Sequence, residues 1–273
     1  MKINPALQVL LIAVLLSPAL NVRAQKLPRI QEQNMLLATH SIRIDGRLGD
    51  WEQGVAAYNK PFGVYYSVAN DDQNLYLVIR SANRTSAKKM VVGGVTFTVG
   101  QSDRKAEENH SSVTFPYYDR NTPSWFISFP AGSTDARQND SLLAAYNGAI
   151  AVKFRTIGVR GFKSVTDSLI SIYNEEGIKA AAQFDKDLSY CYELAIPLKL
   201  LGITANAAKL SYTIKLNGIP IHGTNLQLQT YGRDIISYTG YNGANVQVGK
   251  ATPEMIELVL PTDFSGQYDL VFK

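Results

Sequence analysis

Alternation between apolar and polar side chains recurs along this chain and predicts β-strands. Residues 75–80 place Leu75, Leu77 and Ile79 on one side, and residues 190–196 repeat the pattern. Such period-two patterning, with β-branched and aromatic residues, is typical of strands that bury one face. Further runs lie at residues 62–69, 95–99 and 212–217. Because Gly, Asn, Asp and Pro separate the runs, the pattern predicts a mainly β protein folded as an antiparallel β-sandwich.

Helical patterning is confined to two segments. Residues 136–146 place three apolar side chains on one face after a group of capping residues, and residues 84–90 predict a single turn. The sandwich is therefore expected to carry one or two short helices. Residues 224–246 are rich in Gly, Asn and Tyr and lack periodicity. They predict a long irregular region, the kind of segment in which binding function often lies.

The start of the chain predicts a secretory signal peptide. Lys2 supplies a positive charge, residues 6–20 are largely apolar, and residues 22–24 form a small-x-small cleavage motif before Gln25. The apolar run is too short for a comfortable membrane span. We therefore expect a periplasmic or secreted protein without a membrane span in the mature chain. The expected organisation is a signal peptide at 1–24, a flexible leader at 25–33 and one β-sandwich domain at 34–273.

Charge and cysteine content narrow the class of partner. The formal net charge is +4, and removing residues 1–24 takes away Lys2 and Arg23 and leaves +2. A nearly neutral mature chain argues against a nucleic-acid partner, which needs Lys and Arg clustered on one face. Cys191 is the only cysteine, so no internal disulfide can form. Its position within a strand-like run predicts a small, buried, apolar role.

Three short motifs resemble one superfamily. Residues 44–51 read Ile-Asp-Gly-x-Leu-x-Asp-Trp, and residues 70–77 read Asn-Asp-Asp-x-Asn-Leu-Tyr-Leu. Residues 192–202 read Tyr-Glu-x-Ala-Ile-Pro-x-x-x-Leu-Gly. In this order the motifs resemble family 9 carbohydrate-binding modules and the wider DOMON-like β-sandwiches. The resemblance implies a β-sandwich and a non-catalytic binding role, with a carbohydrate or cell-envelope glycan as the partner.

The motif residues also have physical interpretations of their own. Asp45 and Gly46 predict a turn with glycine at positive φ, and Trp51 is expected to pack against the sandwich. Glu193 is expected to be a structural partner for a loop or a helix end. Asp71 and Asp72 predict an Asx turn, and the resemblance adds the alternative of a calcium site, because some family 9 modules bind calcium. No other cofactor is expected.

Sugar binding requires aromatic rings next to hydrogen-bonding groups, because a pyranose stacks its apolar face and bonds through its hydroxyls. Two clusters offer this combination. They contain Tyr117, Tyr118, Asn121 and Trp125 in the first, and Tyr231, Arg233 and Tyr241 in the second. Family 9 modules clamp a sugar between two Trp rings, and this chain has no evident second Trp for such a clamp. The alternative is that these tyrosines pack the loops.

The sequence offers no catalytic motif. His40, His110 and His222 lack metal-ligand spacing, and no Gly-x-Ser-x-Gly elbow is present. A glycosidase needs two facing carboxylates, and no such pair can be inferred from the sequence. The leading hypothesis is a binding module for carbohydrate. The alternatives are a structural or accessory envelope protein without a small-molecule ligand, and a glycoside-active enzyme.

Overall fold

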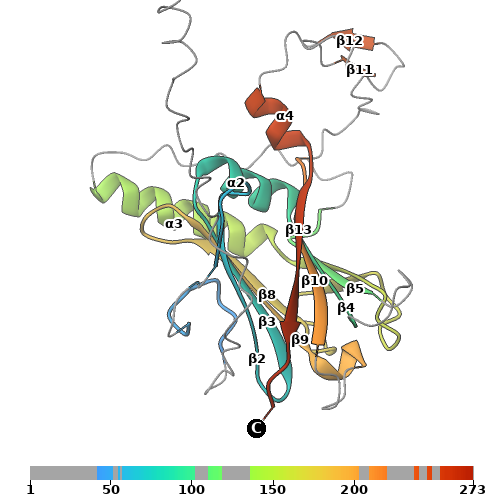
Figure 1. The fold of residues 1–273 in the computed structure, drawn as a ribbon. Coiled ribbons are helices and arrows are strands. Elements are labelled where there is room, and N and C mark those ends of the chain that lie inside the picture. Colours follow the sequence, from blue (N-terminus) through green and yellow to red (C-terminus); the bar gives the residue numbers. More distant parts are fainter. Residues whose placement is uncertain are drawn as a thin grey trace, which may run out of the picture.

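The computed structural model describes much of the chain from residue 42 onward. The described residues are 42–51, 55, 57–101, 110–118, 136–202, 209–219, 237–239, 245–247 and 253–272. They form two antiparallel β-sheets packed face to face (Figure 1), which confirms the predicted β-sandwich. The expected signal peptide and leader lie outside the described residues. None of the helices in the described part is both long and apolar enough to span a bilayer.

The first sheet has five strands, each antiparallel to its neighbours. In spatial order they are β1 (Ala57–Asn59), β2 (Val64–Asn70), β3 (Asn74–Ser81), β9 (Tyr190–Pro197) and β8 (Lys179–Phe184). The second and third sequence motifs supply its central strands, β3 and β9. Asp71 turns the chain from β2 into β3 by accepting backbone hydrogen bonds from residues 73 and 74.

The second sheet has six strands. They are β13 (Thr262–Asp269), β10 (Lys209–Leu216), β4 (Val95–Gln101), β5 (Ser111–Phe115), β6 (Thr156–Arg160) and β7 (Leu169–Ser171). A separate pair, β11 (Ser237–Thr239) and β12 (Asn245–Gln247), overlaps residues 224–246 and ends one residue beyond them. That region was expected to be irregular, and its described parts are short antiparallel strands instead.

Helices cover parts of the sandwich, and one is longer than the sequence predicts. α2 (Arg84–Lys88) runs into a π-helical turn, η1 (Lys89–Gly93), and a 3-10 turn, η4 (Leu198–Leu201), follows β9. α3 (Ala136–Lys153) and α4 (Pro253–Val259) are the other two helices of the described part. On α3, the Asn147 side chain donates to the carbonyl of Phe184 at 2.9 Å and accepts from its N–H at 2.8 Å. α3 thereby satisfies backbone groups at the free edge of β8, which would otherwise be open to pairing.

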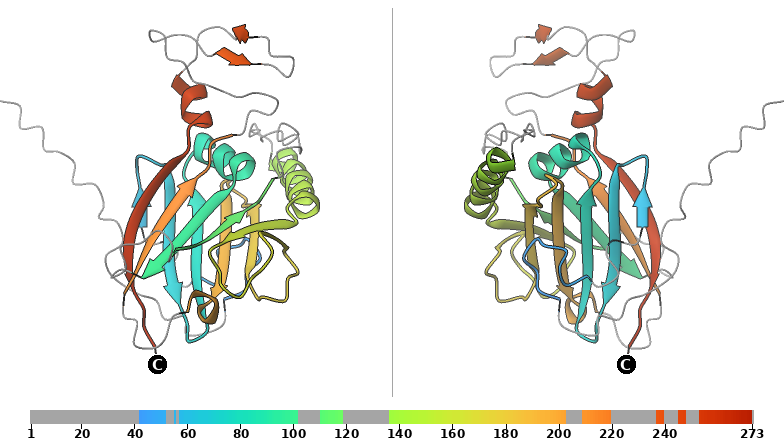
Figure 2. Two further views of the ribbon diagram at one scale, coloured as in Figure 1. Left: turned by 90° about the vertical axis from the view of Figure 1, so that its right-hand side faces the viewer. Right: turned by 90° about the vertical axis from the view of Figure 1, so that its left-hand side faces the viewer.

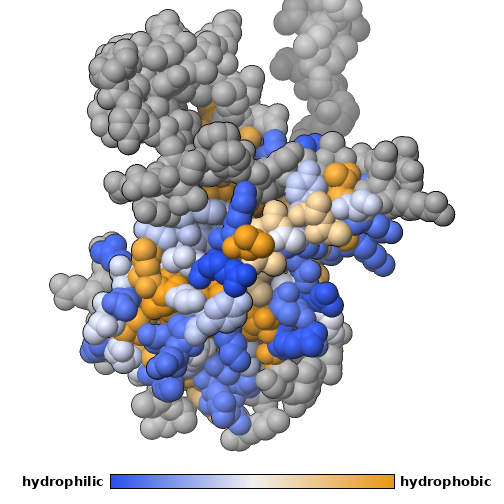
Figure 3. All heavy atoms as spheres, turned by 180° about the vertical axis from the view of Figure 1, so that it is seen from behind, coloured by the Kyte–Doolittle hydropathy of each residue, from blue (hydrophilic) through white to orange (hydrophobic). Residues whose placement is uncertain are grey.

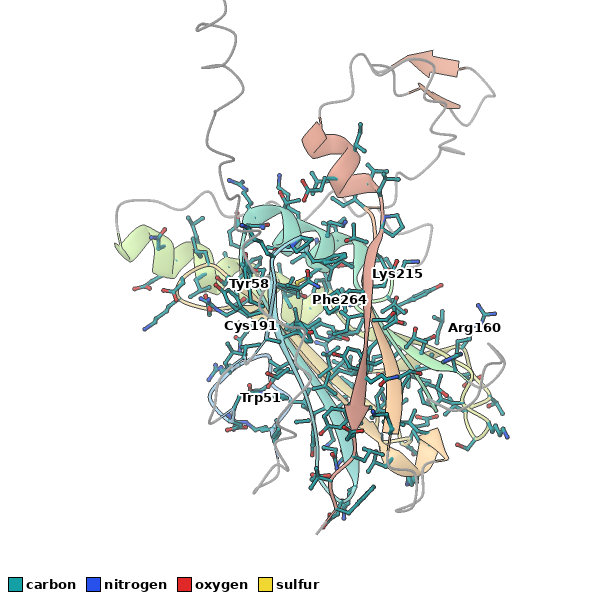
Figure 4. The ribbon with its side chains drawn as sticks, viewed as in Figure 1. Trp51, Tyr58, Arg160, Cys191, Lys215 and Phe264 are labelled. Carbon is teal, nitrogen blue, oxygen red and sulfur yellow. The ribbon has the colours of Figure 1, made fainter. Side chains whose placement is uncertain are left out.

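The core fills the space between the two sheets. Tyr192, Leu194 and Ile196 point inward and are at most 1 % exposed, as the alternation predicts. Cys191 is also buried, at 1 % exposure, which confirms its predicted burial, although its thiol faces the Asp185 carboxylate rather than the core. Phe264 lies between the sheets in Figure 4. Seen from behind, the described surface shows small hydrophobic groups among hydrophilic ones (Figure 3).

Candidate functional site

The first and third sequence motifs meet on the outer face of the five-stranded sheet. The carboxylate of Glu193, on β9, accepts hydrogen bonds from the N–H groups of Asp45 and Gly46 at 2.9 and 2.6 Å. It also accepts one from the indole N–H of Trp51 at 2.7 Å. Glu193 is 0 % exposed although it points away from the core, because residues 42–51 cover it. Glu193 therefore attaches residues 42–51, which we call the opening segment, to the sheet, as expected of a structural partner.

The opening segment also depends on glycine and on apolar packing. Gly46 has a φ of +81°, and a Cβ added there would lie 2.8 Å from the carbonyl carbon of Ala182 on β8. Other residues would be strained in this backbone conformation and would clash with the strand. Trp51 is 6 % exposed and belongs to a second apolar cluster. The cluster contains Ile42, Trp51, Ala69, Tyr76, Val78 and Ala195. The predictions for Gly46 and Trp51 are confirmed.

Burial sets the protonation of Glu193. Desolvation raises its pKa from 4.5 to about 6, against the three hydrogen bonds, which lower it. Both carboxylate oxygens are used by the fold, and the side chain has no exposed surface. This carboxylate is therefore a structural group rather than a candidate general acid, even though its pKa is perturbed.

We expect the stability contributed by Glu193 to fall as the pH rises from about 4.5 to about 6. The pKa is higher in the folded than in the unfolded state, so the contribution is complete below the unfolded value and is lost through the folded value. The shift corresponds to about 2 kcal/mol. Urea melts of the wild type and of Glu193→Gln at several pH values measure the free energy of unfolding with and without this ionisable group. The wild type should lose about 2 kcal/mol relative to the variant between about pH 4 and about pH 8. A constant difference would show that the carboxylate titrates alike in both states.

Asp71 uses both of its carboxylate oxygens within the fold. Its Oδ1 accepts from the N–H groups of Gln73 and Asn74 at 2.8 and 2.6 Å, and its Oδ2 accepts from the Tyr76 hydroxyl at 2.6 Å. This is the predicted Asx turn. Among the described residues, no group of three or more His, Cys, Asp or Glu side chains is placed to hold a metal ion. The calcium site at Asp71 and Asp72 stays a prediction.

The structure separates the two adjacent tyrosines of the first predicted sugar-binding cluster. Tyr118 donates its hydroxyl to the carbonyl of Val91 at 2.6 Å, and its ring packs edge to face against Phe154 at 5.9 Å. Burial raises the pKa of Tyr118, which is part of the fold rather than an open platform. Tyr117 is 38 % exposed, and its ring lies against Gly158 on β6. A Cβ added at Gly158 would lie 2.5 Å from that ring, so glycine makes the placement possible.

The other residues predicted to bind sugar lie outside the described residues. They are Asn121, Trp125, Tyr231, Arg233 and Tyr241. Of the first cluster, Tyr117 is thus the described residue that offers an open ring.

Tyr117 stands at one end of a surface rich in hydroxyl groups, on the outer face of the six-stranded sheet. Two rows of side chains cross this sheet in register. They are Ser265, Thr213, Thr98, Ser112 and Arg160 in one row, and Asp263, Lys215, Thr96, Thr114 and Gly158 in the other. We call the two rows, together with Tyr117, the hydroxyl face. The left view of Figure 2 looks onto it, and Figure 4 shows Lys215 and Arg160 on this side. Strands 4.7–4.9 Å apart give each row a length of about 19 Å.

The hydroxyls of this face are ordered and only partly used. Thr96 and Thr114 share a hydrogen bond at 2.8 Å, and Thr213 and Ser265 share one at 2.7 Å. Thr96 also bonds to the side-chain amide of Asn217, so the first pair has a further partner within the fold. A pair of hydroxyls without such a partner uses one hydrogen for its shared bond and keeps the second hydrogen and several lone pairs. The exposed pair at Thr213 and Ser265 can therefore both donate to and accept from a ligand.

A separate hollow of about 700 Å³ lies beside the turn that joins β2 and β3. Three carboxylates and two lysines contribute to its lining: Asp72, Glu175, Glu176, Lys179 and Lys199. Its one aromatic residue, Phe272, packs against the core. Because a sugar needs an open ring for stacking, the hydroxyl face suits carbohydrate better than this hollow does.

Comparisons with known proteins assign neither a family nor a function to this chain. Neither the protein-family models nor the curated proteins include a match to this chain.

Proposed function

We propose that this chain is an exported, non-catalytic module that binds carbohydrate on the hydroxyl face. Tyr117 carries the proposal. Its ring is 38 % exposed, is held against Gly158, and lies at the end of a row of threonine hydroxyls. This arrangement joins an apolar stacking surface to donors and acceptors, which is the combination that a pyranose requires.

The shape and charge of the face support the same ligand class. A row of about 19 Å would be filled by an oligosaccharide rather than by a single sugar ring. Serine and threonine supply four of the five residues of the first row and two of the five of the second, and the ionic residues include both signs, with Lys215 opposite Asp263. A polyhydroxylated, uncharged chain therefore fits the surface better than a polyanion does.

The sequence supports the compartment and the class. The pattern of residues 1–24 predicts export, and the three motifs resemble carbohydrate-binding modules of family 9. Asn121 and Trp125 follow Tyr117 within eight residues of sequence, so Trp125 is the candidate for a second stacking ring.

Screening the mature protein on a glycan array tests the proposal, followed by affinity measurements on Tyr117→Ala and Trp125→Ala. Removal of one stacking ring should cost on the order of 1–3 kcal/mol, so each variant should bind about tenfold more weakly or worse. The melting temperature should change little, because Tyr117 is exposed. Val152→Ala, which removes exposed apolar surface on α3, is the matched control and should retain affinity.

Two outcomes would contradict the proposal. If no glycan on the array is bound, the envelope-protein alternative is favoured. If Tyr117→Ala and Trp125→Ala unfold the protein but spare sugar affinity, these rings belong to the fold and the binding surface lies elsewhere.

A further inference from the structure

A second row of outward-pointing side chains, exposed or partly exposed except for the buried Cys191, crosses the five-stranded sheet on the opposite side of the sandwich. Its members oppose one another in register, in the order Tyr58, Tyr65, Arg80, Cys191 and Gln183. We call this the tyrosine–arginine row. Figure 4 shows Tyr58 and Cys191 on the side of Trp51, away from Lys215 and Arg160. The row therefore shares no residue with the hydroxyl face.

Two aromatic rings form one end of the row. Tyr58 and Tyr65 are a direct cross-strand pair whose rings stack with centroids 4.5 Å apart and an interplanar angle of 29°. Tyr65 is 37 % exposed. Stacking uses one face of each ring, and within the described part of the chain neither hydroxyl has a hydrogen-bond partner. The pair is thus a stacked ring platform on the outer face of the sheet.

Arg80, next to Tyr65, is held in a fixed orientation. Its Nε donates to Oδ2 of Asp185 at 2.8 Å, and its Nη2 donates to Oδ2 of Asp187 at 3.1 Å. Asp185 is itself fixed, because its Oδ1 accepts from the N–H groups of Asp187 and Ser189, each at 2.9 Å. A guanidinium has five N–H groups, so three are not used by Asp185 or Asp187. The Arg80 side chain is 25 % exposed.

The hydrogen-bonding groups of Arg80 and Asp187 indicate which class of ligand the row can bind. Arg80 offers donors, and Asp187, whose side chain is 63 % exposed, offers acceptors. A phosphate would use only the donors and an amine only the acceptors, whereas a sugar hydroxyl both donates and accepts. One arginine beside two aspartates gives a local formal charge of −1, which disfavours an anionic ligand.

We infer that the tyrosine–arginine row is a second carbohydrate-binding site and that it takes neutral sugars in preference to acidic ones. A pyranose stacks beside Tyr65, and its hydroxyls bond to Arg80 and Asp187. This site shares a ligand class with the proposed function but depends on a different surface. Two sites on opposite faces would allow one molecule to bridge two glycan chains, with a corresponding gain in avidity.

Amide NMR titrations of the full mature chain locate binding on each surface separately. The neutral probes are the methyl glycosides of glucose, galactose, mannose and N-acetylglucosamine, and the acidic probe is the methyl glycoside of glucuronic acid. We expect shifts at Tyr65, at Arg80 and in residues 185–189 with at least one neutral probe, and weaker binding of the glucuronide than of the glucoside. Tyr65→Ala should weaken binding there about tenfold or more. Tyr65→Phe, which keeps the ring, should have a smaller effect.

The pattern of shifts distinguishes this inference from the proposed function. Shifts confined to the hydroxyl face would overturn the second site and leave the proposed function standing. Shifts confined to the tyrosine–arginine row would support the second site, and the glycan array with its oligosaccharides then tests the hydroxyl face separately. Shifts on neither surface would overturn the second site. Equal affinity for the glucuronide and the glucoside would overturn the stated preference. Asp187→Asn removes one negative charge, so it should raise the affinity for the glucuronide relative to the glucoside.

Discussion

Replacing Glu193 by alanine should destabilise the fold by about 3 to 5 kcal/mol, because two buried donors and one partly buried donor lose their common acceptor. The donors are the N–H groups of Asp45 and Gly46 and the indole of Trp51, all within 2.9 Å of the carboxylate. The opening segment would also lose its attachment to the sheet, so the second apolar cluster would become exposed. A urea melt at neutral pH measures the change in the free energy of unfolding.

Two further variants serve as controls for the Glu193→Ala measurement. Glu175→Ala removes an exposed glutamate and should change the free energy of unfolding by less than about 0.5 kcal/mol. Trp51→Phe keeps most of the ring but removes one donor, and it should cost less than Glu193→Ala does. If Glu193→Ala costs under about 1 kcal/mol, the carboxylate does not hold the opening segment in place.

The alternation of side chains was sufficient to predict the central strands but not the short peripheral ones. β9 and β10 have a large apolar side chain at every second position, which indicates the inward face of each strand. β3 is apolar at five consecutive positions, as expected of a central strand covered on both faces. β8 turns Ala180 and Ala182 inward, and alanine contrasts too little with its neighbours to reveal a strand. Its place in the sheet follows from pairing with β9, which lies six residues farther along the chain.

Tertiary contacts likewise explain why α3 continues past its predicted end. Asn147 and Gly148 are residues that often terminate helices, so the sequence favoured an end at residue 146. In the structure, the Asn147 side chain bonds to the backbone of Phe184, and Ile150 is buried at 3 % exposure. These contacts lie far apart in sequence and stabilise the final turns, which extend to Lys153.

The candidate sites were only partly visible in the sequence, because each depends on strand register. Tyr117 and Tyr118 are neighbours with equal local signals, and the fold leaves the first ring exposed and packs the second, partly buried, against the core. The tyrosine–arginine row was missed altogether, because Tyr58, Tyr65 and Arg80 come from three different strands. The sequence did hold one indication of this row: Tyr65 and Arg80 occupy outward positions in the alternating patterns at residues 62–69 and 75–80.

Leu194→Ala should destabilise the fold by about 2 to 5 kcal/mol, which is the range for truncating a buried leucine. Leu194 is 0 % exposed at the centre of the core, where a cavity would be surrounded by packed side chains and collapse poorly. Leu169→Ala removes the same atoms from a side chain that is 45 % exposed, and it should cost far less. Lys215→Ala, on the outer face of β10, should be nearly silent. Urea melts of the three variants test the inward and outward faces of the sheets. Equal losses for Leu194→Ala and Lys215→Ala would mean that the register of these strands is wrong.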